Sequence, residues 1–469
     1  MTPSTVNQPI FGKVRHVHMV GIGGIGMSSI AEVLLQWGFT VSGSDLSESA
    51  ITEQLRDRGA QVHIGHDATN LGDADVVVHT SAVDPVENPE TTAAESRGIP
   101  VIGRAKMLAA LTRRKFGVAI AGTHGKTTTT TLAGHVVRAG QLDPTIIVGG
   151  RVDSFEKRNA VAGGGDIVVV EADEFDRTFL QLHPSLAVIT NIEWEHVDIY
   201  DDLADTRDAF VEFAEDVPFY GAVIACIDDE QVRKILPRLS ARTITYGLDA
   251  DARLRAVDVT EEGFTTRFGV VFDDETIGEI ELGSPGTHNV QNALAAVGVG
   301  LELRIPFDQI RAGLAEFSGV FRRFHCRADT GDILVIDDYA HHPTEIAATL
   351  EAAREGWDNR RIIAAFQPHL YSRTQKFYRE FADALSTADV VVLTDIYPAR
   401  EEPIEGVTSA LIAEALDALD HPDVRYVEDK TTLVDRLDEW TGPGDLVLTM
   451  GAGDITEISE QFARRINER

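Results

Sequence analysis

A glycine loop between an apolar strand and a helix constrains this chain more than any other feature. Residues 116–121 are short, apolar and bounded by polar residues, which is typical of a buried parallel strand. The loop Gly122-Thr123-His124-Gly125-Lys126-Thr127-Thr128 follows, and apolar residues at helical spacing come after it. Glycines let backbone N–H groups face an anion, and the helix N-terminus adds partial positive charge. Lys126 can reach nucleotide phosphates and the Thr127 hydroxyl can ligate Mg²⁺, so the loop predicts a phosphate site.

The loop is shorter than the usual phosphate loop. Four residues ordinarily separate the first glycine from the Gly-Lys pair, whereas here only two do, and Ile120 occupies the ordinary glycine position. A turn that merely caps a helix would also use glycines. Packing does not explain a Lys-Thr pair at the helix start, so we interpret the loop as phosphate-binding.

A second glycine motif lies near the N-terminus. Residues 14–20 predict a strand, residues 28–37 predict a helix, and Gly21-Ile22-Gly23-Gly24-Ile25-Gly26-Met27 connects them. This spacing, with Asp45 about twenty residues further on, is typical of a dinucleotide site. Taken alone it indicates NAD. The motif reports only a pyrophosphate near a helix N-terminus, however, so the nucleotide stays open.

Polar side chains follow two strands that come after the phosphate loop. Residues 166–170 are strongly β-branched and end at Glu171, and residues 186–190 are followed shortly by His196. Ligands of open parallel sheets bind beyond the carboxyl ends of the strands. We therefore expect Glu171 to hold Mg²⁺ directly or through water, and His196 to be a ligand in the same site.

A polar helix start follows a β-rich stretch. Residues 241–282 alternate apolar and polar side chains, which predicts antiparallel strands. His288, Asn289 and Asn292 then open an alanine-rich helix. Their side chains could bind a purine, or they could simply cap the helix and face solvent.

A third unit is expected from about residue 328. The neighbouring Arg322 and Arg323 precede it and suit a phosphate or a carboxylate. Further strands are expected at residues 333–336, 361–366, 390–394 and 446–449. Their ends carry Asp, His and Arg, which again indicates a doubly wound sheet with ligands at that edge.

Composition narrows the class of protein. The net charge is −33, and the 42 basic residues include only 8 lysines. Such a surface argues against a general nucleic-acid binder, and we interpret it as an adaptation to a salt-rich cytoplasm. No apolar run approaches the ~18 residues that span a bilayer, no secretory signal is recognisable, and the two cysteines are far apart. We expect a cytoplasmic protein without membrane insertion, either monomer or dimer.

The expected fold is α/β in three consecutive domains. A Rossmann-like nucleotide-sugar domain is expected over residues 1–112, and a central P-loop ATPase-like domain with a mostly parallel sheet over residues 113–327. A Rossmann-like C-terminal domain that binds amino acid and ATP is expected over residues 328–469.

Taken together, these motifs resemble the Mur ligases over nearly the whole chain. The most specific features are the short phosphate loop, Glu171-Ala172-Asp173-Glu174, His288-Asn289 with Asn292, and Asp337-Asp338-Tyr339-Ala340-His341-His342-Pro343. The first glycine motif with Ser42-Gly43-Ser44-Asp45 resembles the alanine-adding members, in which it holds UDP and not NAD.

The resemblance implies an ATP-dependent ligase of peptidoglycan precursor synthesis. The lactyl carboxylate of UDP-N-acetylmuramate attacks the γ-phosphate of ATP, and the amine of L-alanine then attacks the acyl phosphate. It implies ATP and two Mg²⁺ ions as cofactors, with Mn²⁺ able to substitute. The substrates it implies are ATP, UDP-N-acetylmuramate and L-alanine.

The resemblance also assigns residues to roles. Lys126, Glu171, His196 and Arg373 would be catalytic, and Thr127, Glu171 and His196 would bind metal. ATP would be held by Gly122, Thr123, His124, Gly125, Lys126, Thr127, Thr128, His288, Asn289, Asn292, Arg323 and Asp338. The UDP-sugar would be held by Gly21, Gly23, Gly24, Ile25, Gly26, Met27, Ser44, Asp45 and Ser81. The amino acid would be held by Tyr339, His341, His369 and Arg373.

The sequence departs from the Mur ligase pattern at two positions, and three alternative functions stay open. Family members often show Asp-His where this chain has Glu195-His196, and some carry Arg at the position of Leu370. No lysine lies between 158 and 233, so we expect no carbamylated lysine at the metals. The alternatives are a recycling ligase that adds a pre-formed peptide, an NAD-dependent oxidoreductase, and a non-catalytic nucleotide-binding protein.

Overall fold

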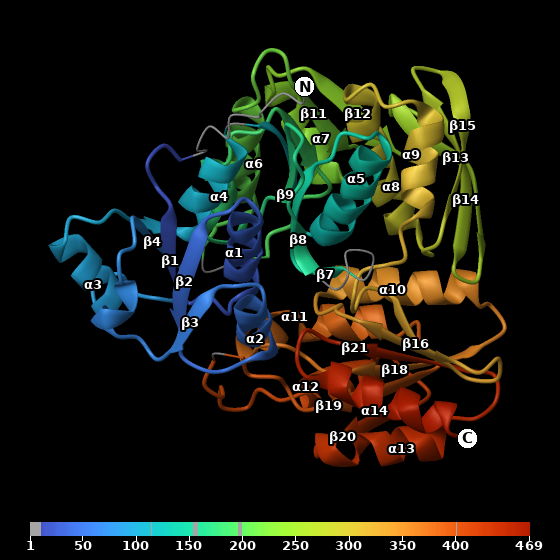
Figure 1. Cartoon of the computed structure of the whole chain (residues 1–469). Coiled ribbons are helices and arrows are strands. Elements are labelled where there is room, and N and C mark those ends of the chain that lie inside the picture. The colour runs from blue at the N-terminus through green and yellow to red at the C-terminus, as the bar shows by residue number, and fades with distance from the viewer. Residues whose placement is uncertain (1–10, 114, 153–157, 196–198, 400) are drawn as a thin grey trace. The chain divides into compact units, whose positions relative to one another are not determined.

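The computed structural model describes residues 11–113, 115–152, 158–195, 199–399 and 401–469. Within these ranges the strands form three sheets (Figure 1). The chain divides into two compact units. The first comprises Met1–Val257, Val270–Gly278 and Gln291–Phe317, and the second comprises Asp258–Gly269, Glu279–Val290 and Ser318–Arg469.

The first sheet is parallel and has the strand order β3-β2-β1-β4-β5 in the described chain. Its strands are β1 (His16–Val20), β2 (Thr40–Asp45), β3 (Gln61–Ile64), β4 (Val76–His79) and β5 (Val101–Gly103). Its helices are α1 (Ile25–Gln36), α2 (Ala50–Asp57), α3 (Pro89–Ser96) and α4 (Arg104–Thr112). The central strand β1 is buried along its whole length. The crossover from β1 through α1 to β2 confirms the strand, glycine loop and helix that the sequence predicts.

The second sheet has the order β15-β14-β13-β12-β11-β10-β6-β9-β7-β8 among the described strands. The strands are β6 (Phe116–Ala121), β7 (Thr145–Val152), β8 (Arg158–Val161), β9 (Ile167–Glu171), β10 (Leu186–Ile189), β11 (Ala222–Cys226), β12 (Thr243–Gly247), β13 (Leu254–Glu262), β14 (Thr265–Phe272) and β15 (Glu275–Leu282). The helices are α5 (Lys126–Ala139), α6 (Leu203–Glu215), α7 (Glu230–Ile235), α8 (Thr287–Glu302) and α9 (Phe307–Ala315).

Strand direction in this sheet differs in part from the prediction. Residues 241–282 were expected to be antiparallel throughout, but β12 pairs parallel to both β11 and β13. The connections β13–β14 and β14–β15 contain two residues each, a length that joins antiparallel neighbours only. Alternating side chains report a half-buried strand and carry no information on direction, which explains the error at β12.

The third sheet has the order β16-β17-β21-β18-β19-β20 in the described part of the chain. It is parallel except for the pair β16–β17. Its strands are β16 (His325–Asp329), β17 (Leu334–Asp338), β18 (Arg361–Phe366), β19 (Val390–Thr394), β20 (Val424–Val427) and β21 (Asp445–Met450). Its helices are α10 (Pro343–Gly356), α11 (Tyr371–Leu385), α12 (Ala410–Ala418), α13 (Leu433–Trp440) and α14 (Ile455–Asn467).

The apolar strands β6, β10 and β11 place the phosphate loop. Their central residues are fully buried between helices, as continuous Val, Ile and Ala runs in a parallel sheet require. Burial fixes the register of each strand, and therefore fixes where the polar loop at its carboxyl end begins. None of the described helices combines the length and apolarity needed to cross a membrane.

Candidate active site

The phosphate loop is hydrogen-bonded to the segment that follows β10. The backbone N–H of His124 donates to Oδ1 of Asn191 (2.7 Å), and the Thr190 hydroxyl donates to the carbonyl of His124 (2.7 Å). Gly122 has φ 144°, and a Cβ there would lie 1.9 Å from Oγ1 of Thr190. Only glycine permits that approach, so the loop glycine is explained by packing against the next strand end.

Lys126 is folded back onto its own loop. Its Nζ donates to the carbonyls of Gly122 (2.8 Å) and Thr123 (3.0 Å) and to Oε2 of Glu174 (2.7 Å). Only 12% of the Lys126 side chain and 3% of the Glu174 side chain are exposed. Burial opposes the charged form of Lys126, but the carboxylate of Glu174 outweighs it and raises the pKa of the lysine. Lys126 is therefore a fixed cation at the loop.

Thr127 and Glu171 meet at the carboxyl edge of the sheet. The Thr127 hydroxyl donates to Oε1 of Glu171 (3.1 Å), while the N–H of Gly149 donates to Oε2 (2.7 Å). Burial raises the pKa of Glu171. A hydroxyl and a carboxylate that face one another are hard oxygen ligands, so this pair fits Mg²⁺. His196 lies outside the described residues.

Asn292 of α8 lies against the phosphate loop within the first unit. The Thr129 hydroxyl donates to Oδ1 of Asn292 (3.0 Å). Gly125 has φ 78°, and a Cβ there would lie 2.6 Å from the same oxygen. The second loop glycine therefore makes room for the amide of Asn292.

The first glycine motif is hydrogen-bonded to the end of β2, which includes the carboxylate of Asp45. The N–H of Gly23 donates to Oδ2 of Asp45 (2.8 Å), and the N–H groups of Gly21 and Ile22 donate to the carbonyl of Ser44 (2.8 and 3.0 Å). Gly24 and Ile25, the latter 50% exposed, face outward, whereas Met27 is buried. The structure thus places Asp45 against the loop itself.

The side chain of Ser44 belongs to a buried polar network. Its hydroxyl donates to Glu90, and it is 2.9 Å from Nδ1 of His66. Asn70 also donates to Glu90 (2.6 Å), and Nε2 of His18 lies 3.5 Å away. Burial tends to raise the pKa of Glu90, but the bonds from His18, Ser44 and Asn70 outweigh it and lower this pKa to about 2. Ser81, by contrast, is exposed in the turn after β4.

His288 and Asn289 open α8. Asn289 is 5% exposed and its amide donates to Oγ of Ser284 (2.9 Å) and to the carbonyl of Pro285 (2.7 Å). Burial, together with the charge of Arg323, lowers the pKa of His288 to about 4. His288 is therefore neutral near pH 7 and offers one donor and one acceptor nitrogen.

Arg323 and Asp338 lie together in the second unit. Oδ2 of Asp338 accepts from the N–H of Phe324 (2.6 Å), and Oδ1 accepts from the N–H of Ala340 (2.7 Å). Burial raises the pKa of Asp338 to about 6, against the opposing charge of Arg323. Arg323 itself pairs with Glu345 at 3.2 Å.

Three of the predicted amino-acid-binding side chains come together. The rings of Tyr339 and His341 lie 5.2 Å apart, and those of His341 and His369 lie 5.9 Å apart, both edge to face. Arg373 lies in the first turn of α11, which begins at Tyr371 just after His369. Leu370 between them has φ 70° and ψ 135°, a conformation that side chains rarely adopt.

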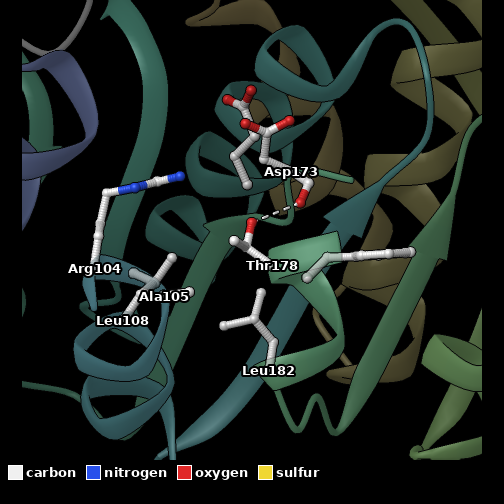
Figure 2. Close-up of a pocket in the computed structure, with 8 residues that line it drawn as sticks. Arg104, Ala105, Leu108, Asp173, Thr178 and Leu182 are labelled. Carbon is white, nitrogen blue, oxygen red and sulfur yellow. Dashed lines mark hydrogen bonds between the residues drawn. The ribbon is translucent and has the colours of Figure 1, made fainter. Parts of the chain in front are cut away.

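A small pocket adjoins the Mg²⁺-type pair in the first unit. Figure 2 shows Arg104, Ala105 and Leu108 of α4 on one side, and Asp173, Thr178 and Leu182 on the other. Glu171 and Phe179 also line it. The Thr178 hydroxyl donates to the carbonyl of Asp173 (3.1 Å), which fixes the turn after β9.

Some residues of the site were not identified from the sequence. Glu174 appeared only within a motif, and Asn191, Glu193 and Arg104 received no role. Glu193 accepts from Nε2 of His124 (3.2 Å) and its N–H donates to Thr123 Oγ1 (2.8 Å). The sequence places Glu174, Asn191 and Glu193 after the ends of predicted strands. It does not give their hydrogen-bond partners, because these depend on how β6 and β10 pair.

A short phosphate loop, a Mg²⁺-type oxygen pair and a separate glycine-loop domain define a nucleotide-dependent α/β enzyme. Models described as the Mur ligase family catalytic domain, the Mur ligase middle domain, and the Mur ligase glutamate ligase domain match residues 16–116, 120–300 and 322–453. The chain belongs to the Mur ligase family. The first glycine motif is therefore part of a Mur ligase, and the oxidoreductase interpretation is wrong.

Individual relatives match this chain over nearly its full length. A UDP-N-acetylmuramate–L-alanine ligase of Salinibacter ruber is 57% identical over 97% of this chain and 96% of that protein. A ligase of the same name from Geotalea uraniireducens is 49% identical, with 97% and 99% covered. The crystal structure of a UDP-N-acetylmuramate–alanine ligase from Thermotoga maritima has a TM-score of 0.81 at 32% identity and covers 97% of this chain and 99% of that one. The three-domain α/β expectation is confirmed.

Proposed function

We propose that this enzyme joins L-alanine to the lactyl carboxylate of UDP-N-acetylmuramate and consumes ATP in the step. The observation that carries the proposal is the pairing of Thr127 with Glu171 beside the fixed cation Lys126. The alanine-ligase names of relatives at 49–57% identity support the choice of acceptor. The lactyl carboxylate takes the γ-phosphoryl group of ATP and releases ADP, which gives an acyl phosphate. The amine of alanine then attacks the acyl carbon, and inorganic phosphate leaves as the amide bond forms.

The chain's own residues would bring three anionic groups together with little covalent help. Loop N–H groups and Lys126 bind the ATP phosphates, and His288, Asn289 and Asn292 take the adenine. Thr127, Glu171 and His196 would hold Mg²⁺, which lowers the repulsion between the carboxylate and the γ-phosphate. Arg323 and Asp338, which belong to the second unit, would also bind the nucleotide.

The remaining roles follow the same assignment. Gly21, Gly23, Gly24, Ile25, Gly26, Met27, Ser44, Asp45 and Ser81 form the UDP-sugar site. Asp45 and Ser44 would act by shaping the glycine loop, because their oxygens bind its N–H groups. Tyr339, His341, His369 and Arg373 form the amino-acid site. The domains would run over residues 1–112, 113–327 and 328–469.

The decisive experiment measures phosphate release from ATP in the presence of UDP-N-acetylmuramate and one amino acid at a time. L-alanine should support turnover, with glycine and serine weaker. Replacing alanine by the tripeptide of wall recycling tests the alternative ligase, and efficient use of the tripeptide would overturn our proposal.

Two Mg²⁺ ions are proposed, with Mn²⁺ as a substitute. If His196 binds the second ion, His196→Ala should raise the Mg²⁺ concentration needed for half-maximal acyl-phosphate formation. The check is a metal titration of wild type and variant at saturating ATP and UDP-sugar. An unchanged titration would remove His196 from the metal site.

A further inference from the structure

We infer that Arg104 binds the sugar-side phosphate of the UDP-sugar diphosphate. This inference rests on the proposed function and adds a substrate-binding residue to it. Arg104 is the first residue of α4 and directly follows β5. Because β1, β4 and β5 are parallel neighbours, the carboxyl end of β5 lies at the same sheet edge as the first glycine loop.

The side chain of Arg104 lies against that loop. A Cβ at position 26 would be 2.8 Å from Nη1 of Arg104, 3.3 Å from Cδ and 3.4 Å from Cζ. Gly26 therefore leaves the space that the guanidinium occupies. A diphosphate seated at the N-terminus of α1, on the N–H groups of Ile25 and Gly26, would meet this guanidinium next. The planar fork of the guanidinium suits two phosphate oxygens at once.

The charge of Arg104 is available to a ligand. Across the described ranges its guanidinium makes no hydrogen bond or ion pair, although the side chain is half-buried in a chain of net charge −33. In the same domain, Arg56 and Arg58 are paired with Glu48 and Glu32. A half-buried cation without a carboxylate partner in so acidic a chain is well suited to an anionic substrate.

The small pocket shows where the side chain of Arg104 lies relative to the Mg²⁺-type pair. Figure 2 shows the guanidinium of Arg104 reaching across the pocket toward the side of Asp173, with Glu171 also in the lining. Arg104 therefore lies between the glycine loop and the Mg²⁺-type pair, which is where the sugar end of the proposed substrate would lie. Leu108, Phe179 and Leu182 form apolar walls, which strengthen the attraction by lowering the local dielectric.

The test compares the affinities of four ligands for wild type, Arg104→Ala and Arg104→Lys by calorimetry. The ligands are uridine monophosphate, UDP, UDP-N-acetylglucosamine and UDP-N-acetylmuramate. Arg104→Ala should weaken UDP and both UDP-sugars about ten- to a hundred-fold and leave uridine monophosphate unchanged. Arg104→Lys should recover part of the loss, because it keeps the charge but not the fork. The Michaelis constants for ATP and alanine should not move.

Lys106→Ala is the matched control, because Lys106 is an exposed cation on the same helix and carries the same charge. Equal losses in Lys106→Ala would overturn the inference in favour of a general charge effect. A loss confined to UDP-N-acetylmuramate would place Arg104 on the lactyl carboxylate, and an equal loss for uridine monophosphate would make its role structural. If wild type binds none of the UDP-sugars, the proposed function fails. If wild type binds them and Arg104→Ala binds them equally well, the proposed function stands and the role of Arg104 is rejected.

Discussion

Lys126 makes three contacts at the phosphate loop, and two of them are to carbonyls of the loop itself. These carbonyls hold the ammonium where nucleotide phosphates would lie. The third contact, to Glu174, is a buried ion pair. Removing one partner of such a pair leaves an uncompensated charge, which costs about 3–5 kcal/mol of stability. Loss of turnover and loss of folding must therefore be separated.

Lys126→Ala should slow turnover by at least two orders of magnitude, corresponding to about 3 kcal/mol in the barrier, because the cation follows charge into the transition state. The measurement is turnover at saturating substrates, together with the melting temperature. The double variant Lys126→Ala/Glu174→Gln removes the orphaned carboxylate and should recover stability but not activity. Near-normal turnover in the folded double variant would contradict the assignment of Lys126.

Arg373→Lys should raise the Michaelis constant for alanine far more than that for ATP. The substitution keeps the charge but loses the bidentate geometry that a carboxylate prefers. Initial rates with alanine and ATP varied in turn give the two constants, and their ratio identifies the substrate that lost a contact. Equal changes in both constants would instead place Arg373 at the nucleotide.

At the scale of elements, the first sheet is organised around a buried carboxylate. Glu90 on α3 joins β1 through His18 and β2 through Ser44, and it is fully buried. Its pKa is lowered from 4.5 to about 2. A carboxyl group whose pKa is lower in the folded state stabilises the fold at pH values above its ordinary pKa. This contribution is lost as the pH falls from about 4.5 towards 2.

Glu90→Gln should destabilise the protein near pH 7 by roughly 2–3 kcal/mol. The difference in melting temperature between wild type and variant should shrink as pH is lowered from 5 to 3, because wild type then loses its ionised carboxylate. Glu95→Gln is the control, since Glu95 is exposed on the same helix. A difference that stays constant across this pH range would show that Glu90 does not act through its charge.

The phosphate loop shows the same dependence of one element on another. Its glycines are required by Thr190 after β10 and by Asn292 on α8, not by the loop alone. A helix N-terminus supplies the N–H groups, while the neighbouring strand end sets their orientation. The geometry of the site therefore resides in the pairing of β6 with β10, whose register aligns Ala121 with Ile189.

At the scale of the whole molecule, 75 acidic residues face 42 basic ones. Many arginines are engaged in surface ion pairs, for example Arg253 with Asp273 and Arg267 with Glu281. Salt weakens such pairs, but each is worth about 1 kcal/mol at most. The unpaired excess of carboxylates repels itself over the Debye length of about 10 Å at 0.1 M salt. Relief of this repulsion should be the larger effect.

The melting temperature and the activity should therefore rise as KCl is increased from below 0.1 M to about 1–2 M, concentrations at which the Debye length falls to about 3 Å or less. The measurement is a thermal melt and an initial rate at each concentration, with sucrose as an uncharged solute for comparison. An optimum at low KCl would refute the interpretation of the acidic surface.

The sequence alone determined the parts of the protein that local chemistry encodes. The order of strand, glycine loop and Lys-Thr pair at Gly122–Thr128 predicts a phosphate loop, because packing does not explain a Lys-Thr pair at the start of a helix. Continuous Val and Ile runs specify buried parallel strands, so the α/β class and the polar strand ends could be predicted. The direction of β12 could not be predicted, because alternation of apolar and polar side chains is the same in parallel and antiparallel strands.

Tertiary structure alone decided which side chains meet. Glu174 reaches Lys126 across 48 positions of sequence, and Arg104 reaches Gly26 from another strand end. Such contacts depend on the order of strands in a sheet and on their register, which no residue specifies by itself. The sequence determined which chemistry stands at the strand ends, and the packing of the sheets decided which ends lie side by side, because burial of the strands fixes their neighbours.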